Sequence, residues 1–327
     1  MFSLNIYIYR INDRFNVSEG SLDNGRIYYK AYIPKYMKES HLAVLLHGFG
    51  GSSEMMNMIA SALAENGVTS ITYDIPGHGK SVGSLYKNIS NAREDFLHLV
   101  EKAKEFGANT NSIVVIGHSM GAGYAQAIAK NDTRIKCLIL LGSSPNPQTL
   151  NENIKVNLLV SNGENDEIVD IKRCLNAFEN VTGLRNITVG KIYGSFKENN
   201  AKEFYVSKLN DHLTILYAEE SVNKIVSWVT EFYNLEDIIL STFQRLIVYI
   251  STSILTFSCL ILAIKLIPSK FSGHKNLFRN LDRKPVLAYL ILTFLAAPIA
   301  LLLQTPLAII LPLFISDFII AFFYTQL

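Results

Sequence analysis

The sequence predicts an α/β fold, in which a mostly parallel sheet carries helices on both faces, followed by C-terminal transmembrane α-helices. Short apolar runs alternate with helical stretches of about ten to twenty residues, which is typical of strands buried between helices. Beyond about residue 240 the composition becomes strongly apolar, and this raises the hydrophobic share of the 327 residues to 49% and the mean hydropathy to +0.21. We therefore expect a folded domain over residues 1–240 and a transmembrane region over residues 241–327.

The predicted strands begin at the N-terminus. Residues 1–15 have a short apolar alternation, no basic leader and no small-residue cleavage site, and are interpreted as a strand rather than a signal peptide. Residues 26–34 alternate apolar and polar side chains, as a half-buried strand does. The further predicted strands are HLAVLLHG (41–48), VTSITYD (68–74), SIVVIGHS (112–119), IKCLILLGSS (135–144), IKVNLLVSNGE (154–164) and AKEFYVSKL (201–209). Ligands of such a sheet bind beyond the carboxyl ends of its strands, so the segments that follow these runs are the candidates for a site.

Charge and cysteine content exclude several classes of function. Residues 241–327 contain seven Lys or Arg and two Asp, so they carry +5 and the rest of the chain carries −3 of the total of +2. A domain so close to neutrality has no basic face for nucleic acid. Cys137, Cys174 and Cys259 show neither a paired framework nor a CxxC spacing, so we expect no disulfide scaffold and no zinc site. No cofactor is expected either, because no metal-ligand spacing or dinucleotide fingerprint occurs.

The most specific motif is Gly117-His118-Ser119-Met120-Gly121, a G-x-S-x-G between the run SIVVI and a predicted helix. In this context the serine occupies a strained strand-to-helix turn, and glycines on either side leave room for the backbone. A plain glycine-rich connection is the alternative, but it would not need to lie between a strand and a helix. Ser119 is therefore the candidate nucleophile.

A serine needs a base, and the base needs a carboxylate to orient it. His212 is the one histidine between the last predicted strand and the helix that ends the domain, which makes it the candidate base rather than a solvated loop histidine. Asp166 follows the apolar run that ends in VSNGEN and is the candidate acid. The order Ser119, Asp166, His212 is the one expected for this type of fold. Close competitors for the acid are Asp170, Glu164 and Glu167.

Acyl transfer also needs donors directed at the developing oxyanion. The main-chain N–H of Met120, the residue after the nucleophile, is one candidate. The second is the main-chain N–H of Phe49, because Gly48, Gly50 and Gly51 let the loop after His47 turn tightly beside the serine. His47 itself is expected only to hold that loop in shape.

These segments together resemble the α/β-hydrolase superfamily, in particular its monoacylglycerol lipase, lysophospholipase and serine aminopeptidase-like branch. The matching segments, which span about half of the chain, are HGFGGSS (47–53), YDIPGHGKS (73–81), GHSMGAG (117–123), GENDEIV (163–169) and DHL (211–213). The resemblance implies that Ser119, Asp166 and His212 form a catalytic triad and that Phe49 and Met120 supply the oxyanion hole. It also implies that Asp74 and His78 are structural rather than catalytic.

One departure from that family concerns the cap. Members that act on large lipids usually carry a helical cap before the strand that ends in the acid, but here only PNPQTLNENIKV separates LILLGSS from that strand. About a dozen residues cannot build a lid, so we expect an open site with a minimal cap or none. An open site favours smaller esters, or a substrate that the membrane presents.

Three transmembrane spans are predicted, over residues 246–267, 286–303 and 307–324. The first has one charged residue, Lys265, near an end where it can reach the headgroups, and is long enough to cross a hydrocarbon core of ~30 Å. The polar break Gln304-Thr305-Pro306 separates the other two. A buried helical second domain is the alternative, but its helices would show polar faces. Asp317, within the third span, receives no role.

The side of the membrane on which residues 1–240 lie stays open, because two indications disagree. The basic segment 268–285 is cytoplasmic by the positive-inside rule, which would place the domain outside, whereas no export signal is recognised. The functional hypothesis is a membrane-anchored serine hydrolase that cleaves a carboxylic ester with an amphiphilic acyl group, with no obligatory protein partner. Alternatives are a thioesterase, acyltransferase or peptidase with the same triad, a non-catalytic membrane scaffold, or a transporter with a soluble appendage.

Overall fold

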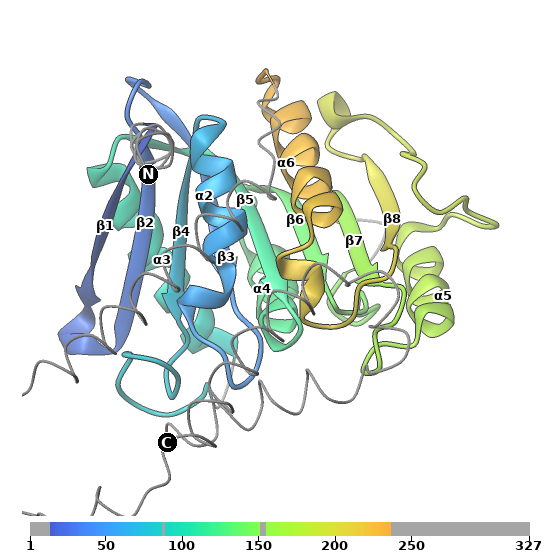
Figure 1. Cartoon of the computed structure of the whole chain (residues 1–327), viewed down its shortest axis with the longest axis horizontal. Coiled ribbons are helices and arrows are strands. Elements are labelled where there is room, and N and C mark those ends of the chain that lie inside the picture. Colours follow the sequence, from blue (N-terminus) through green and yellow to red (C-terminus); the bar gives the residue numbers. More distant parts are fainter. Residues whose placement is uncertain (1–13, 87–88, 151–154, 237–327) are drawn as a thin grey trace, which may run out of the picture. The chain divides into compact units, whose positions relative to one another are not determined.

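The computed structural model describes residues 14–86, 89–150 and 155–236 (Figure 1). The chain divides into two compact units, Met1–Thr242 and Phe243–Leu327, and all described residues belong to the first. The three predicted spans and residues 1–13 of the predicted N-terminal strand lie outside the described residues. None of the helices in the described ranges combines the length and the hydropathy that crossing a bilayer requires.

The core of the domain is an eight-stranded sheet with the order β1-β2-β4-β3-β5-β6-β7-β8. From β4 to β8 neighbouring strands are parallel, whereas β1 and β2 join the sheet in antiparallel fashion. The strands are β1 Phe15–Leu22, β2 Ile27–Pro34, β3 Ser40–Leu46, β4 Val68–Asp74, β5 Ala108–His118, β6 Ile135–Leu141, β7 Asn157–Gly163 and β8 Lys202–Ser207. The predicted mostly parallel sheet is thus confirmed.

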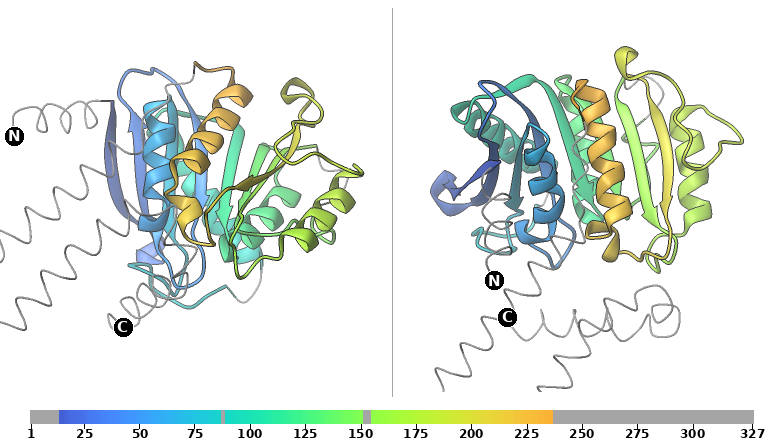
Figure 2. Two further views of the ribbon diagram at one scale, coloured as in Figure 1. Left: turned by 45° about the vertical axis from the view of Figure 1, so that its right-hand side comes forward. Right: turned by 45° about the horizontal axis from the view of Figure 1, so that its top comes forward.

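Within the described ranges, five α-helices cover the two faces of this sheet (Figures 1 and 2). One face packs against α3 (Ile89–Glu105), α4 (Met120–Asn131) and α5 (Ile171–Thr182). The opposite face packs against α2 (Asn57–Glu65) and α6 (Glu219–Tyr233). The prediction of helices on both faces is confirmed as well.

Covering both faces explains why the central strands read as continuous apolar runs. In β3, Leu42, Val44 and Leu46 belong to the core beneath α3 and α4, while Ala43 and Leu45 belong to the core beneath α2 and α6. All five are fully buried. Because successive side chains of a strand point to opposite faces, a strand buried on both sides has no polar position.

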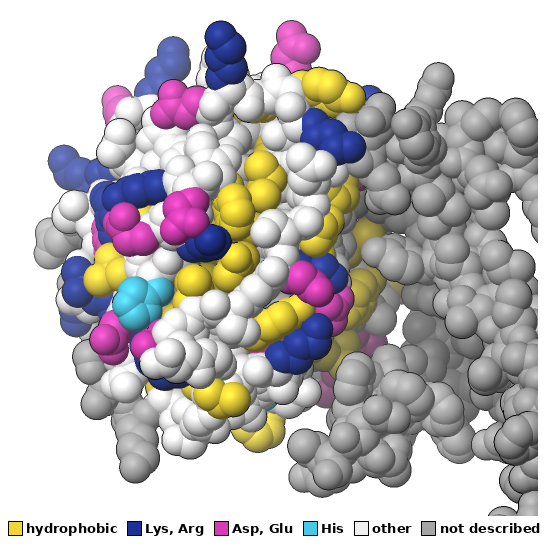
Figure 3. Space-filling view, turned by 90° about the vertical axis from the view of Figure 1, so that its left-hand side faces the viewer, with side chains coloured by type: hydrophobic (Ala, Val, Ile, Leu, Met, Phe, Trp, Pro, Cys, Tyr) yellow, Lys and Arg dark blue, Asp and Glu magenta, His cyan; other side chains and the backbone are white. Residues whose placement is uncertain are grey.

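The first strand differs from the prediction. β1 begins at Phe15, where the predicted strand ends, and only Phe15 of its eight residues is buried. A partly solvated edge strand with Ser, Asn and Gly has no strong apolar alternation. The turn Asp23-Asn24-Gly25, which has positive φ at all three residues, was the available signal for a hairpin. Figure 3 shows this side of the domain, where Lys and Arg side chains are mixed with Asp and Glu, so neither sign dominates that face.

The connection between β6 and β7 is short, as predicted. Of its residues that the structure describes, 142–150 and 155–156, none is helical. The described part of this connection therefore contributes no helical cap over the carboxyl ends of the strands.

Candidate active site

Ser119 lies at the sharp turn between the end of β5 and the first residue of α4. Its backbone has φ 51° and ψ −115°, a conformation that costs a residue with a side chain about 1–3 kcal/mol. The flanking glycines are required by close backbone approach. A Cβ on Gly117 would lie 2.5 Å from Ala122 Cα, and one on Gly121 would lie 2.4 Å from the Leu46 carbonyl oxygen. The turn leaves Ser119 partly exposed at the carboxyl edge of the sheet.

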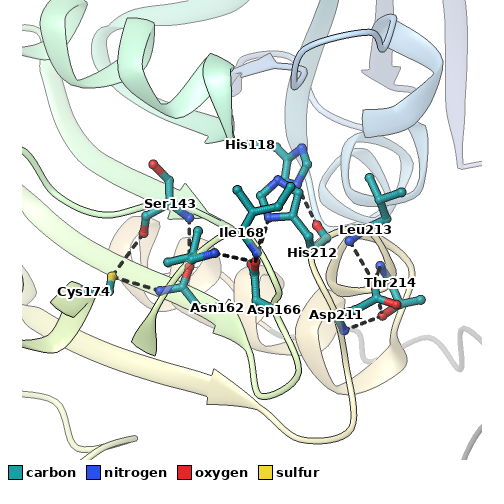
Figure 4. A network of polar contacts seen from close by, with 11 residues as sticks. His118, Ser143, Asn162, Asp166, Ile168, Cys174, Asp211, His212, Leu213 and Thr214 are labelled. Carbon is teal, nitrogen blue, oxygen red and sulfur yellow. Dashed lines mark hydrogen bonds and ion pairs between the residues drawn. The ribbon is translucent and has the colours of Figure 1, made fainter. Parts of the chain in front are cut away.

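His212 and Asp166 meet at the same edge, on the loops that follow β8 and β7 (Figure 4). The Nδ1 atom of His212 lies 2.9 Å and 3.1 Å from the two carboxylate oxygens of Asp166. A carboxylate only accepts hydrogen bonds, so Nδ1 carries the proton and Nε2 remains an acceptor. The Asp166 side chain is fully buried and that of His212 is 8% exposed.

The Asp166 carboxylate is itself fixed by its loop. Its Oδ1 accepts hydrogen bonds from the main-chain N–H groups of Ile168, at 2.9 Å, and Val169, at 2.8 Å. These two bonds hold the carboxylate in place, so the imidazole of His212 receives a fixed direction.

The other three candidate carboxylates lie in other surroundings. Asp170 caps α5, where its side chain accepts from the main-chain N–H of Arg173 at 3.0 Å. Glu164 accepts from the main-chain N–H of Leu209 at 3.0 Å, and Glu167 is exposed. Of the four candidates, the structure joins Asp166 to His212.

The loop after β3 forms a tight turn beside Ser119. It is closed by a hydrogen bond of 3.2 Å from Gly51 N–H to the Gly48 carbonyl, with Phe49 and Gly50 at its tip and Gly50 at φ +70°. A Cβ on Gly48 would lie 3.3 Å from Ser119 Cβ, so this loop passes close beside the serine. Met120 is the first residue of α4, and a helix leaves such N–H groups without an intrahelical acceptor.

His47 links this loop to the one after β4. Its Nδ1 lies 2.7 Å from the Gly48 carbonyl, and its Nε2 accepts from the main-chain N–H of Ile75 at 2.9 Å. Burial lowers the pKa of His47 to about 4, so the ring is neutral and can donate at one nitrogen and accept at the other.

Asp74 fastens the same two loops from the other side. One carboxylate oxygen accepts from Ser53 N–H at 2.6 Å and the other from Lys80 N–H at 2.7 Å. His78 packs its ring against Phe49, with 5.7 Å between ring centroids. Both residues therefore lie in the scaffold of the loop rather than beside the reacting side chains.

Sequence reasoning missed several residues around His212 that Figure 4 shows. The Oδ1 atom of Asp211 accepts from the N–H groups of Leu213 and Thr214, at 2.9 Å and 2.7 Å, which fixes the loop that carries His212. The ring of His118 lies beside that of His212, with 4.9 Å between centroids. The Asp at 211 before a Thr at 214 was a recognisable turn signal, whereas nothing in the sequence indicates where His118 points.

A second group lies behind the Asp166 loop. Asn162 Oδ1 accepts from Ser143 N–H at 2.8 Å, and its amide nitrogen lies 3.1 Å from Cys174 Sγ. The Cys174 thiol in turn donates to the Ser143 carbonyl oxygen at 3.3 Å, which closes this network of two side chains and the Ser143 backbone. Burial raises the pKa of the Cys174 thiol to about 11, so it is protonated and has the role of a small packing residue.

Known proteins resemble this chain over part of its length. Residues 38–151 match the model of a family described as serine aminopeptidase, S33. A putative esterase/lipase 2 of Mycoplasma genitalium is 29% identical over 114 residues, which are 34% of this chain and 40% of that protein. A serine hydrolase-like protein of Dictyostelium discoideum is 33% identical over 117 residues, 35% of this chain and 32% of the relative. The chain thus spans no more than 40% of the length of these curated relatives.

Solved structures resemble it over a larger share. A putative lipase from Acinetobacter baumannii superimposes with a TM-score of 0.51 at 17% identity, covering 71% of this chain and 97% of that one. At this identity the likeness concerns the fold, which is that of α/β-hydrolases. The chain therefore has the α/β-hydrolase fold, and its residues 38–151 are similar to the serine aminopeptidase, S33 family.

Proposed function

We propose that the chain is a membrane-anchored serine hydrolase that cleaves carboxylic esters through Ser119, His212 and Asp166. The observation that carries the proposal is the hydrogen bond between His212 Nδ1 and the buried Asp166 carboxylate, at the edge where Ser119 is held in a strained turn. A strained turn persists only where the surrounding structure fixes it, and such turns concentrate at functional sites.

In the proposed reaction His212 Nε2 takes the proton of the Ser119 hydroxyl as the oxygen attacks the acyl carbon. The carbonyl π electrons move to the carbonyl oxygen, and the main-chain N–H groups of Phe49 and Met120 stabilise that charge. His212 then returns the proton to the leaving alkoxide, and an acyl-enzyme remains. Water, activated by the same nitrogen, hydrolyses the acyl-enzyme and restores Ser119.

An amphiphilic acyl substrate is supported by exposed apolar side chains on the loops that carry the proposed catalytic groups. Phe49, Ile168 and Tyr217 are 76%, 72% and 45% exposed, and each lies within a few residues of a proposed catalytic group. Three large apolar side chains on three loops favour a substrate that has more apolar surface than the reacting ester alone.

The first experiment treats the purified full-length protein with a fluorophosphonate probe, which reacts with activated serines. Labelling of the wild type is expected, and it should vanish in Ser119→Ala and His212→Ala. Turnover of p-nitrophenyl esters should fall at least about 10⁴-fold in both variants. A folded wild type that neither reacts with the probe nor cleaves esters of any chain length would overturn the proposal and leave the scaffold alternative. Faster cleavage of matched thioesters or anilides would reassign the substrate.

The membrane anchor is a separate part of the proposal and rests on the sequence of residues 246–324. Full-length protein in isolated membranes is expected to resist extraction by alkaline carbonate and to dissolve in detergent. Release by carbonate alone would refute the anchor and leave the catalytic proposal standing.

A further inference from the structure

His118 lies next to both the proposed nucleophile and the proposed base. It directly precedes Ser119 at the end of β5, the residue is 1% exposed, and its ring centroid lies 4.9 Å from that of His212. The reaction proposed above assigns it no task. A buried histidine in contact with a general base needs an explanation, because an imidazole is costly to bury without hydrogen bonds.

The hydrogen bond of His118 is made to the backbone of the base. Its Nε2 lies 2.8 Å from the main-chain carbonyl oxygen of His212 (Figure 4). A carbonyl oxygen only accepts, so the proton is on Nε2 and the bond runs from the His118 ring to the His212 backbone. His212 is therefore held at two points, by Asp166 through its ring and by His118 through its main chain.

The ring of His118 has little freedom to move, because glycines confine it on two sides. A Cβ on Gly48 would lie 2.7 Å from His118 Nδ1, and one on Gly142 would lie 3.2 Å from His118 Nε2 and 3.1 Å from His212 Cε1. Gly48 belongs to the loop that carries the proposed oxyanion donor Phe49. One ring thus contacts the loop after β3, the serine turn and the base.

The charge of His118 is also constrained. Burial lowers its pKa to about 4, and the neighbouring His212 acts in the same direction. Near neutral pH the ring is neutral, so His212 can become an imidazolium during the reaction without a second cation beside it. In different environments, two adjacent histidines can thus have different roles: His118 stays neutral while His212 exchanges a proton.

We propose that His118 is a positioning residue: its Nε2–H, bonded to the His212 carbonyl oxygen, fixes the backbone of the base so that the imidazole meets the Ser119 hydroxyl. The proposal rests on the function proposed above, since it presupposes that His212 is the base. A histidine that only fills space would not need a donor at this atom, and this difference can be tested.

The test compares three replacements in the full-length protein. In glutamine the amide nitrogen lies the same number of bonds from Cβ as Nε2 does in histidine, so His118→Gln keeps a donor near the His212 carbonyl. His118→Asn places its nitrogen one bond short, and His118→Leu fills the space without a donor. His98→Leu, on α3, is a control for the loss of a histidine elsewhere in the domain.

We expect kcat for p-nitrophenyl esters to fall about 10–100-fold in His118→Asn and His118→Leu, with KM within about twofold of the wild type. The rate of fluorophosphonate labelling should fall in parallel, while His118→Gln stays within about fivefold of the wild type, as expected of a retained donor. The melting temperature of each variant shows whether it is folded. If His118→Leu is unfolded, the kcat values of His118→Asn and His118→Gln are compared instead, and this comparison tests the proposal.

Three results would overturn the proposal. These are full kcat in His118→Asn or His118→Leu, equal loss in all three variants, or a rise in KM with unchanged kcat. An unreactive wild type would instead refute the proposed function. The two failures are therefore distinguishable.

Discussion

At the scale of single residues, four carboxylates lie close together in sequence between residues 164 and 170. Their hydrogen-bond partners show which of them contacts His212. Asp166 is bonded to His212, whereas Asp170 is bonded to the N-terminus of α5. This difference yields the first prediction. Asp166→Asn replaces an acceptor with an amide that can donate to His212 Nδ1, which favours the wrong tautomer and should lower kcat by roughly 10³–10⁴-fold.

The matched control is Asp170→Asn, which should leave kcat within about twofold because asparagine caps helices about as well as aspartate. Glu164→Gln keeps an acceptor for the Leu209 N–H and should behave likewise. Steady-state kinetics on p-nitrophenyl esters tests all three variants. A larger loss in Asp170→Asn than in Asp166→Asn would assign the acid to residue 170.

Residues that a local motif or a position after a strand marks could be predicted from the sequence. A residue whose role depends on a contact with a distant part of the chain could not. The glycines two positions away on either side predict Ser119, and the position after the last strand predicts His212. His118 lies inside the same motif, yet its bond partner is 94 residues further along the chain. Only the assembled sheet brings the ends of β5 and β8 to one edge and shows that contact.

At the scale of elements, the turn into α4 depends on how closely the helix approaches β3. A Cβ on Gly121 would lie 2.4 Å and 2.5 Å from the carbonyl oxygens of Leu46 and His47, and backbone atoms cannot move aside cheaply. Gly121→Ala is therefore expected to displace the start of α4 and lower the free energy of unfolding by more than about 2 kcal/mol, with loss of fluorophosphonate labelling. Urea unfolding and probe labelling measure the two effects.

Gly123 supplies the comparison on the same helix, because a Cβ there would have no heavy atom within 4 Å. Gly123→Ala should keep labelling and raise stability by up to about 1 kcal/mol, since alanine favours a helix. If the two alanine variants lost the same stability, the close packing of Gly121 would not be the cause.

Elements with a strong apolar pattern were predictable, and those with a weak one were not. The runs that became β3 to β7 are buried by helices on both faces, and this burial is what makes them continuous in the sequence. β1 lies at the edge with one buried residue, so its existence follows from pairing with β2 rather than from its own composition. The turn between β1 and β2 was a better indicator of this strand than its hydrophobicity.

At the scale of the whole molecule, the parallel arrangement brings loops from four separate strands to one edge. β3 supplies the loop with Phe49, β5 is followed directly by Ser119, β7 is followed by the loop with Asp166, and β8 is followed by the loop with His212. The sequence could predict this convergence, because parallel strands end at the same side of a sheet. It could not predict that the buried, neutral ring of His118 bonds the end of β5 to the loop after β8, or that buried, neutral His47 holds the loop after β3 through Ile75, after β4.

Those two histidines also make the stability of the domain depend on pH. Burial lowers the pKa of each to about 4, whereas the unfolded chain has the ordinary value of 6.5. Between these values the unfolded state binds more protons than the native state, so stability is fully present above about pH 6.5 and is lost as the pH falls toward 4. Below that range both states are protonated and the loss is complete.

Buried carboxyls act in the opposite direction, because burial raises the pKa of Asp95 and Glu203, and this opposes the loss at low pH. A variant isolates the histidine contribution. His118→Gln removes one titrating ring, so the difference in unfolding free energy between pH 7 and pH 5 should shrink by about 2 kcal/mol relative to the wild type. Urea unfolding can be followed by the fluorescence of Trp228, the single tryptophan, which is 1% exposed in α6. An unchanged difference would mean that His118 is protonated equally in both states and that burial does not keep it neutral.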